Sequence, residues 1–194
     1  MSKQFVTNNI GNKIEYDPKA KGYRYRVDGQ GKTSATTEIG KRMDKSFLGN
    51  WYKKNRDESI KEIMLMDKKP IDQINTFIEK VKKRAEEKET WARDIGTMLH
   101  EWIDLYLKGQ KPALPESEPL LSMVNKWKNW WVAQKFEVVL SELPLYSKKF
   151  DCAGCNDVIV TKKKWKGQNA VLDWKTSKDY SLDQAIQVEV YRRF

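Results

Sequence analysis

Residues 170–175 read Ala-Val-Leu-Asp-Trp-Lys, an apolar run that ends in a carboxylate and an amine two positions apart. Side chains alternate faces along a β-strand, so Asp173 and Lys175 would point the same way, roughly 7 Å apart, while Trp174 packs on the opposite face. Metal-dependent hydrolysis uses a carboxylate that can hold a divalent metal and a group that orients a water molecule. The stretch therefore predicts a strand that carries part of a metal-dependent site.

A second apolar run, residues 157–160, begins with Asp157 and predicts a neighbouring strand. The segment between the two runs, residues 162–169, contains Gly167 and is long enough to form the connecting turn. Pairing of these strands would bring Asp157 beside Asp173. The two carboxylates would then be candidate ligands of one metal ion.

Farther upstream, Phe136, Val138 and Leu140 recur at every second position and predict a third strand. Glu142 has the same parity, so we expect its carboxylate on the face that these apolar side chains bury. An acid on a buried face usually has a metal or a cationic partner. Glu142 is therefore a candidate accessory acid.

His100 is the only histidine of the chain, and it lies on an amphipathic helix that we expect Gly96 to open. A neutral imidazole could add a nitrogen ligand to an oxygen-rich metal site. The alternative is a histidine whose ring is satisfied by a backbone carbonyl.

The rest of the chain indicates α/β architecture. Lys13 to Tyr16 and Tyr23 to Val27 predict a β-hairpin, and residues 37–134 are helical in pattern. In that region an apolar stripe from Ile71 to Val81 precedes a charged stretch, residues 82–89. After residue 135 apolar residues recur at every second position, which predicts β-strands. Ser181 with Gln184 three residues later matches a capping box and predicts a helix at the end of the chain.

We expect a central mixed β-sheet flanked by the His100 helix and by the last helix. The expected divisions are a β-hairpin region (1–36), a helical lobe (37–90) and a core (91–194), together forming one compact domain.

The composition of the chain narrows the classes of partner that it could bind. Thirty-seven Lys and Arg against 27 Asp and Glu give a formal charge of +10, which favours a polyanion such as nucleic acid, with an anionic membrane second. No apolar run approaches the roughly 18 residues of a membrane span, so we expect a soluble, intracellular protein without a membrane partner. Two cysteines, Cys152 and Cys155, are too few for a four-thiolate iron–sulfur cluster, and small packing roles are expected for both.

Several motifs occur in the order typical of one nuclease family: Gly96-Thr97-Met98-Leu99-His100, Glu142, Ala153-Gly154-Cys155-Asn156-Asp157, Asp173-Trp174-Lys175-Thr176 and Gln187 to Tyr191. Across about residues 90 to 191 the chain resembles the RecB-like branch of the PD-(D/E)XK nucleases. It is similar to the exonucleases of mitochondrial genome maintenance and their phage relatives. The N-terminal hairpin that leads into Ser34-Ala35-Thr36-Thr37 also fits.

This resemblance implies a restriction-endonuclease-like core and a Mg²⁺- or Mn²⁺-dependent deoxyribonuclease, most often an exonuclease acting on single-stranded DNA ends. It implies Asp157, Asp173, His100 and the carbonyl of Trp174 as metal ligands, Lys175 as the group that handles the water, and Glu142 as an accessory acid. Gln187 and Tyr191, four apart on one helix face, would position DNA or Lys175. A bacterial or phage-infected cytoplasm is the expected location.

The chain departs from the family at its end, because relatives usually continue after the position of Tyr191 into a further strand and helix. The alternatives are a truncated chain, a compact variant, or an open sheet edge that the N-terminal hairpin or another chain covers, as in a homo-oligomer. The alternatives to an exonuclease are a non-catalytic DNA-binding or assembly protein that keeps the fold, a structure-specific endonuclease, and a nuclease that cleaves RNA.

Two further features have competing interpretations. The basic and aromatic stretch Tyr23-Arg24-Tyr25-Arg26 could bind phosphates and stack on bases, but a solvated face explains it equally well. Trp127 and Trp131 continue one helical stripe and are expected in the core, whereas Trp130 falls outside it.

Overall fold

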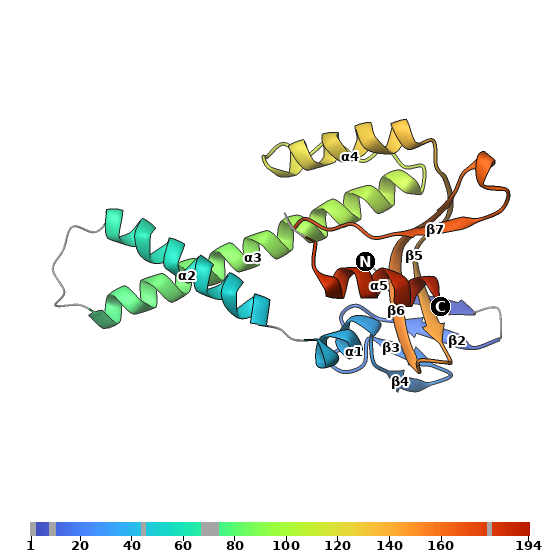
Figure 1. The fold of residues 1–194 in the computed structure, drawn as a ribbon, viewed down its shortest axis with the longest axis horizontal. Helices are drawn as coiled ribbons and strands as arrows, with labels where there is room; N and C mark the ends of the chain where they lie inside the picture. Colours follow the sequence, from blue (N-terminus) through green and yellow to red (C-terminus); the bar gives the residue numbers. More distant parts are fainter. Residues whose placement is uncertain (1–2, 8–10, 44–45, 67–73, 178–179) are drawn as a thin grey trace. The chain divides into compact units, whose positions relative to one another are not determined.

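A computed structural model describes residues 3–7, 11–43, 46–66, 74–177 and 180–194 (Figure 1). The chain divides into two compact units. The first combines residues 1–43 with residues 98–194, and the second comprises residues 44–97. All candidate site residues named above belong to the first unit.

An antiparallel sheet in the first unit has the order β1-β2-β3-β4, with strands Gln4–Thr7, Lys13–Tyr16, Tyr25–Val27 and Gln30–Lys32. Alternation along β2 and β3 buries one face, on which Tyr16 and Tyr25 stack with ring centroids 4.8 Å apart. Asp28 and Gly29 both have positive φ, as a two-residue hairpin turn requires. This turn joins β3 to β4. The predicted hairpin is that of β2 and β3, and their antiparallel pairing confirms it, with β3 beginning at Tyr25.

A second sheet has the order β5-β6-β7, formed by Glu137–Ser147, Cys152–Thr161 and Asn169–Leu172, with a 3₁₀ turn at Lys163–Trp165. Both pairings are antiparallel. Among the described residues, parallel pairing occurs only as an isolated β-bridge between Ser34 and Ala153. The architecture is α/β as expected, but the prediction of a mixed central sheet is wrong, because consecutive strands joined by short turns pair antiparallel.

Strand β7 ends at Leu172, so the prediction that the strand continues through Lys175 is wrong. Its last ladder pair joins Leu172 to Val158. In this register the next position places Asp173 opposite Asp157. The predicted pairing of the two strands, which brings these acids together, is confirmed.

Strand β5 is irregular where the candidate acid lies. Its register shifts between Val138 and Leu140, and both side chains are exposed, so the prediction that they share a buried face is wrong. Glu142 is nevertheless buried, with 6% of its surface exposed. Its backbone φ of 48° lies in the left-handed region, which residues other than glycine rarely adopt. Ser141 pairs with Val158 and Leu143 with Asn156, which places Glu142 opposite Asp157.

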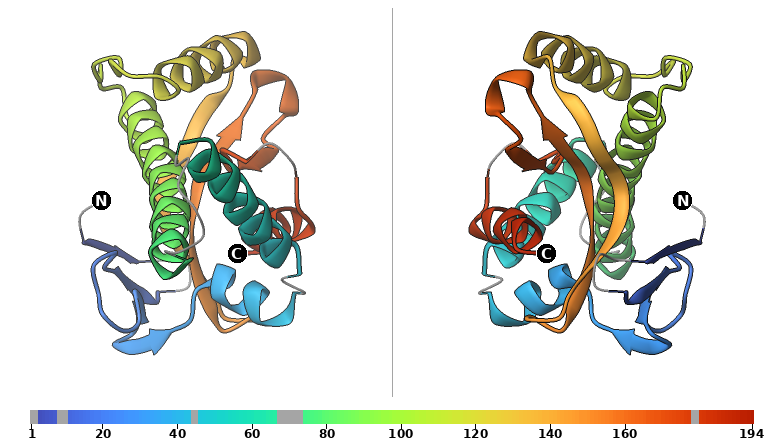
Figure 2. Two further views of the ribbon diagram at one scale, coloured as in Figure 1. Left: turned by 90° about the vertical axis from the view of Figure 1, so that its left-hand side faces the viewer. Right: turned by 90° about the vertical axis from the view of Figure 1, so that its right-hand side faces the viewer.

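The helices of the first unit are α1 (Ala35–Arg42), α4 (Leu120–Gln134), α5 (Leu182–Arg192) and the end of α3 (Ile74–Leu107). Helix α5 and the end of α3 lie on opposite sides of β6 (Figure 2). The predicted capping box is confirmed by a hydrogen bond of 3.3 Å from the Ser181 N–H to Oε1 of Gln184. Trp127 and Trp131 are buried as expected, and Trp130 is 40% exposed.

Helix α3 runs without interruption from Ile74 to Leu107, so the prediction that Gly96 opens a helix is wrong. The charged stretch 82–89 continues the helix because Glu, Lys and Arg favour helical conformation and pair at helical spacing, as Arg84 and Glu87 do at 3.2 Å. Ile71, the first residue of the predicted stripe, lies outside the described residues.

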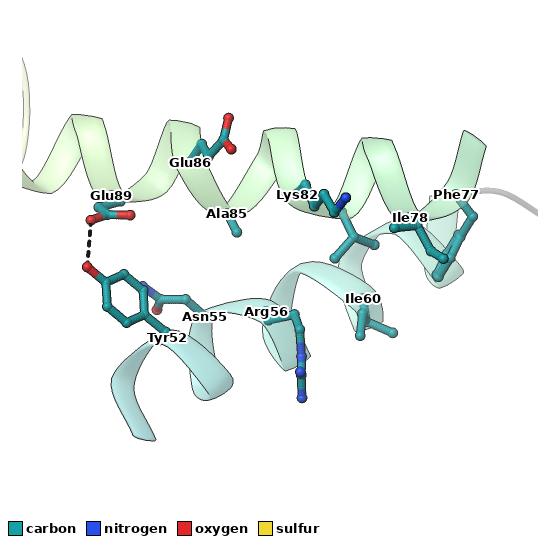
Figure 3. A pocket seen from close by; sticks show the side chains of 11 residues that line it. Tyr52, Asn55, Arg56, Ile60, Phe77, Ile78, Lys82, Ala85, Glu86 and Glu89 are labelled. Carbon is teal, nitrogen blue, oxygen red and sulfur yellow. Dashed lines mark hydrogen bonds between the residues drawn. The ribbon is translucent and has the colours of Figure 1, made fainter. Parts of the chain in front are cut away.

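The second unit contains α2 (Ser46–Met66) and the first part of α3. Tyr52 of α2 donates to Glu89 of α3 at 3.1 Å, and Lys88 pairs with Glu62 at 2.8 Å. Between the two helices lies a mainly apolar groove of about 360 Å³, whose walls include Ile60 and Phe77 (Figure 3).

Among the described helices, none combines the length and apolar character needed to cross a membrane. Both cysteines are free thiols.

Candidate metal centre

Three side chains from distant parts of the sequence converge on one side of β6. His100 comes from α3, Glu142 from β5 and Asp157 from β6, and one ligand atom from each lies within 4.8 Å of the others. Asp157 is 8% exposed and Glu142 6%, so the group is largely shielded from water. Within the residues that the structure describes, this is the group with the composition of a metal site.

The group fits a divalent cation in donor type and nearly fits it in size. The two carboxylate oxygens suit Mg²⁺ or Mn²⁺, and the imidazole nitrogen favours a transition metal such as Mn²⁺ over Mg²⁺. Ligand atoms lie about 2.0–2.2 Å from such ions, so two of them are at most about 4.4 Å apart. The 4.8 Å spread in the structure therefore needs only a small side-chain rotation to reach coordination distance.

The peptide group of Trp174 holds two members of this group. Nε2 of His100 lies 3.0 Å from the Trp174 carbonyl oxygen, and the Trp174 N–H donates to Oδ2 of Asp157. If Nε2 is the protonated nitrogen, Nδ1 is left as the ligand atom, and it lies 3.4 Å from Oδ1 of Asp157. The Trp174 carbonyl thus orients His100, and its direct role as a metal ligand stays a prediction.

The Trp174 ring is fixed by a cluster of aromatic side chains. Its centroid lies 5.6 Å from that of Trp127, 5.8 Å from that of Trp130 and 6.4 Å from that of Trp131. The contacts with all three are edge-on, a favourable arrangement for aromatic pairs. Helix α4 therefore fixes the peptide that orients the candidate ligands.

Burial and repulsion from a neighbouring negative charge raise the pKa values of two acids at the site, Glu142 and Asp173. Burial, followed by the negative charge of Asp157, raises the pKa of Glu142 to about 7. The same two causes raise the pKa of Asp173, although Lys175 opposes the shift. Burial alone would lower the pKa of His100, but its hydrogen bond to Asp157 and the charge of that acid outweigh burial and raise the pKa. A cation among these groups would relieve the crowding of negative charge.

Beside the three-residue group, Asp173 forms an ion pair with Lys175. The Asp173 side chain is 3% exposed and that of Lys175 31%, so the amine is accessible from solvent. Asp173 is outside the set of mutually close ligand atoms. Its predicted role as a metal ligand stays a prediction.

Helix α5 supports Asp173 through the predicted pair on one helix face. Nε2 of Gln187 lies 3.2 Å from Oδ1 of Asp173 and 3.4 Å from the hydroxyl of Tyr191. Tyr191 is 5% exposed, and its ring packs on Gly154 of β6, where an added Cβ would lie 2.4 Å from a ring carbon. Gly154 is therefore needed for α5 to approach the sheet.

Three polar residues around the site were not identified as candidates from sequence. Asp104 accepts from Ser141 at 2.9 Å, and its position four residues after His100 on one helix was the available signal. The Cys155 thiol lies 3.4 Å from Oε2 of Glu142. Asn156, fully buried beside Asp157, makes no side-chain hydrogen bond to the described residues.

Comparison of the chain with protein-family models, with curated proteins and with solved structures finds no match. The resemblance to the PD-(D/E)XK nucleases thus depends on the motifs and their order.

Proposed function

We propose that this chain is a divalent-metal-dependent deoxyribonuclease with a restriction-endonuclease-like core, acting as an exonuclease on single-stranded DNA ends. The observation that carries the proposal is the convergence of His100, Glu142 and Asp157 within 4.8 Å, next to the ion pair between the buried Asp173 side chain and the solvent-accessible Lys175. Hydrolysis of a phosphodiester needs both a cation site and a group that handles the attacking water. The formal charge of +10 adds attraction for a polyanionic substrate.

The proposed roles follow from the positions of the side chains. His100, Glu142 and Asp157 would hold a Mg²⁺ or Mn²⁺ ion, which supplies positive charge to the phosphate and to the leaving oxygen when bound. Lys175 orients the attacking water and stabilises the hydroxide-like charge that develops on it. Asp173 holds Lys175 in place through Oδ2, and Gln187 fixes the carboxylate of Asp173 by donating to its other oxygen, Oδ1.

Cleavage of end-labelled DNA tests this proposal. Wild type, Asp173→Ala and Lys175→Ala are incubated with single- or double-stranded DNA in Mg²⁺, in Mn²⁺ and in EDTA. We expect metal-dependent degradation by wild type and its loss in both variants, and Lys164→Ala, which changes a lysine of the 3₁₀ turn, serves as the matched control. Equal cleavage by wild type and both variants would reject the site. DNA binding without cleavage in any metal would favour a non-catalytic scaffold, and cleavage of circular DNA would identify an endonuclease.

A further inference from the structure

A cavity of about 530 Å³ with both polar and apolar walls lies in the first unit, where the start of β3 meets the start of α1. Cavities of this size hold nucleotide-sized ligands. Two cations, Arg24 and Lys32, contribute to its wall together with the hydroxyl-bearing Ser34 and Thr36, and none of its lining residues is acidic. The wall therefore favours an anionic ligand.

The charges near the cavity strengthen this preference. Arg24 is exposed, and no carboxylate of the described residues lies within ion-pair distance of it. Lys32 pairs with Asp151 at 2.7 Å, so its charge is partly offset. Glu38, an acid in the first turn of α1, is already neutralised by Lys41 and Arg42. The unopposed charge at the cavity is that of Arg24.

An aromatic ring at the cavity wall is held in place and yet open to solvent. Tyr23 is 54% exposed. Its ring lies against the backbone of Gly31, where an added Cβ would be 2.3 Å from Cδ2 of the tyrosine. An exposed ring with a fixed position beside a cation is the arrangement that proteins use to stack a nucleic-acid base.

The cavity is connected to the metal centre through β6. The carbonyl of Thr33, in the cavity wall, accepts from the Ala153 N–H at 3.0 Å, and Tyr25, also in the wall, packs against Ala153. Ala153 and Asp157 share one face of β6 because they are an even number of residues apart. Four residues of strand span about 13 Å, which is the axial rise of about four stacked nucleotides.

We propose that this cavity binds one nucleotide of the strand that enters the metal centre, about four nucleotides from the bond that is cleaved. Arg24 contacts the phosphate, Ser34 and Thr36 lie beside it, and Tyr23 stacks on the base. The inference rests on the proposed function for the identity of the strand, but binding at the cavity needs neither metal nor cleavage.

Binding of a fluorescein-labelled oligo-dT 20-mer in EDTA, followed by anisotropy at several salt concentrations, tests this inference. We expect Arg24→Ala to weaken binding at least about fivefold and to reduce the slope of log affinity against log salt by about 0.7. Arg26→Ala is the matched control, because Arg26 is an exposed arginine of β3, two residues after Arg24, that does not line the cavity. Equal affinity and equal slope for the two arginine variants would overturn the inference.

The stacking role is tested separately. Tyr23→Ala should weaken binding of oligo-dT about fivefold or more but leave binding of an abasic 20-mer unchanged. Gly31→Ala, which keeps the tyrosine but removes the space its ring occupies, should have the same effect. Equal losses for both probes, or none, would remove Tyr23 from the site.

The outcomes separate this inference from the nuclease proposal. Arg24-dependent binding by a protein that never cleaves DNA would keep the cavity and reject the nuclease. Asp173-dependent cleavage with identical binding by the two arginine variants would keep the nuclease and reject the cavity. Absence of oligonucleotide binding by wild type would overturn the inference outright.

Discussion

Replacing Glu142 with glutamine removes a buried negative charge while preserving the shape of the side chain. Burial and the charge of Asp157 raise the pKa of Glu142 from 4.5 to about 7. In the unfolded chain this acid ionises near its ordinary pKa, so the folded state binds more protons between these two pH values. The stability associated with the protonated form is thus fully present below about pH 4.5 and is lost as the pH rises through about 7.

The size of the effect follows from the pKa difference. The raised pKa of Glu142 costs the metal-free protein about 1 kcal/mol at pH 5, where the folded state keeps the carboxyl protonated, and about 3 kcal/mol at pH 8, where the carboxylate is ionised and buried, as an upper limit. Glutamine does not ionise, so Glu142→Gln should avoid this cost. For a chain of this length, the melting temperature in EDTA should rise by roughly 2–4 °C at pH 5 and by roughly 6–12 °C at pH 8.

Thermal denaturation followed by circular dichroism at the two pH values measures the difference. Glu137→Gln is the control, because Glu137 is an exposed acid of the same strand, and it should leave both melting temperatures unchanged. Saturating Mn²⁺ should stabilise wild type more than Glu142→Gln, because the variant lacks a ligand. A shift in melting temperature that is the same at pH 5 and pH 8 would refute the electrostatic reasoning.

The remaining predictions concern packing, positioning and pH. Gly154→Ala should lower the free energy of unfolding in urea by about 1–3 kcal/mol, because the added Cβ would lie 2.4 Å from a carbon of the Tyr191 ring. Gly22→Ala is the control, since an added Cβ there meets no atom within 4 Å, and equal urea midpoints for the two variants would contradict the prediction. Gln187→Ala should slow cleavage about tenfold through kcat with little change in KM, and an effect confined to KM would indicate a role in DNA binding. Mn²⁺ affinity should fall from pH 8 to pH 6, because His100 must be neutral to bind and its pKa is raised, and a pH-independent titration would argue against His100 as a ligand.

The short-range patterns of the sequence predicted much of what positions the site. The apolar runs at 157–160 and 170–172 predicted two paired strands, which the register of Val158 with Leu172 confirms. The Ser181 and Gln184 pattern predicted the start of α5, because a capping box involves only residues three apart. These features depend on residues that are close together in the sequence, so the sequence pattern alone predicts them.

Features that depend on distant contacts were not predicted. The burial of Glu142 was predicted, but the register shift of β5 and the left-handed φ of Glu142 were not, because a two-residue alternation cannot encode either irregularity. The end of β7 at Leu172 depends on hydrogen bonds that Trp174 makes to residues far away in the sequence. The charged stretch 82–89 interrupts the apolar pattern but not helix α3, because it forms ion pairs with other helical residues, such as that between Lys88 and Glu62.

The central claim is that His100, Glu142 and Asp157 together hold one divalent cation. Titration of the protein with Mn²⁺ at pH 8, with free Mn²⁺ measured by electron paramagnetic resonance, tests it most directly. We expect saturable binding by wild type that Asp157→Asn weakens by at least about tenfold, while Asp151→Asn, which changes an exposed acid preceding the same strand, has no effect. Equal Mn²⁺ binding by wild type and Asp157→Asn would contradict the assignment of the metal centre.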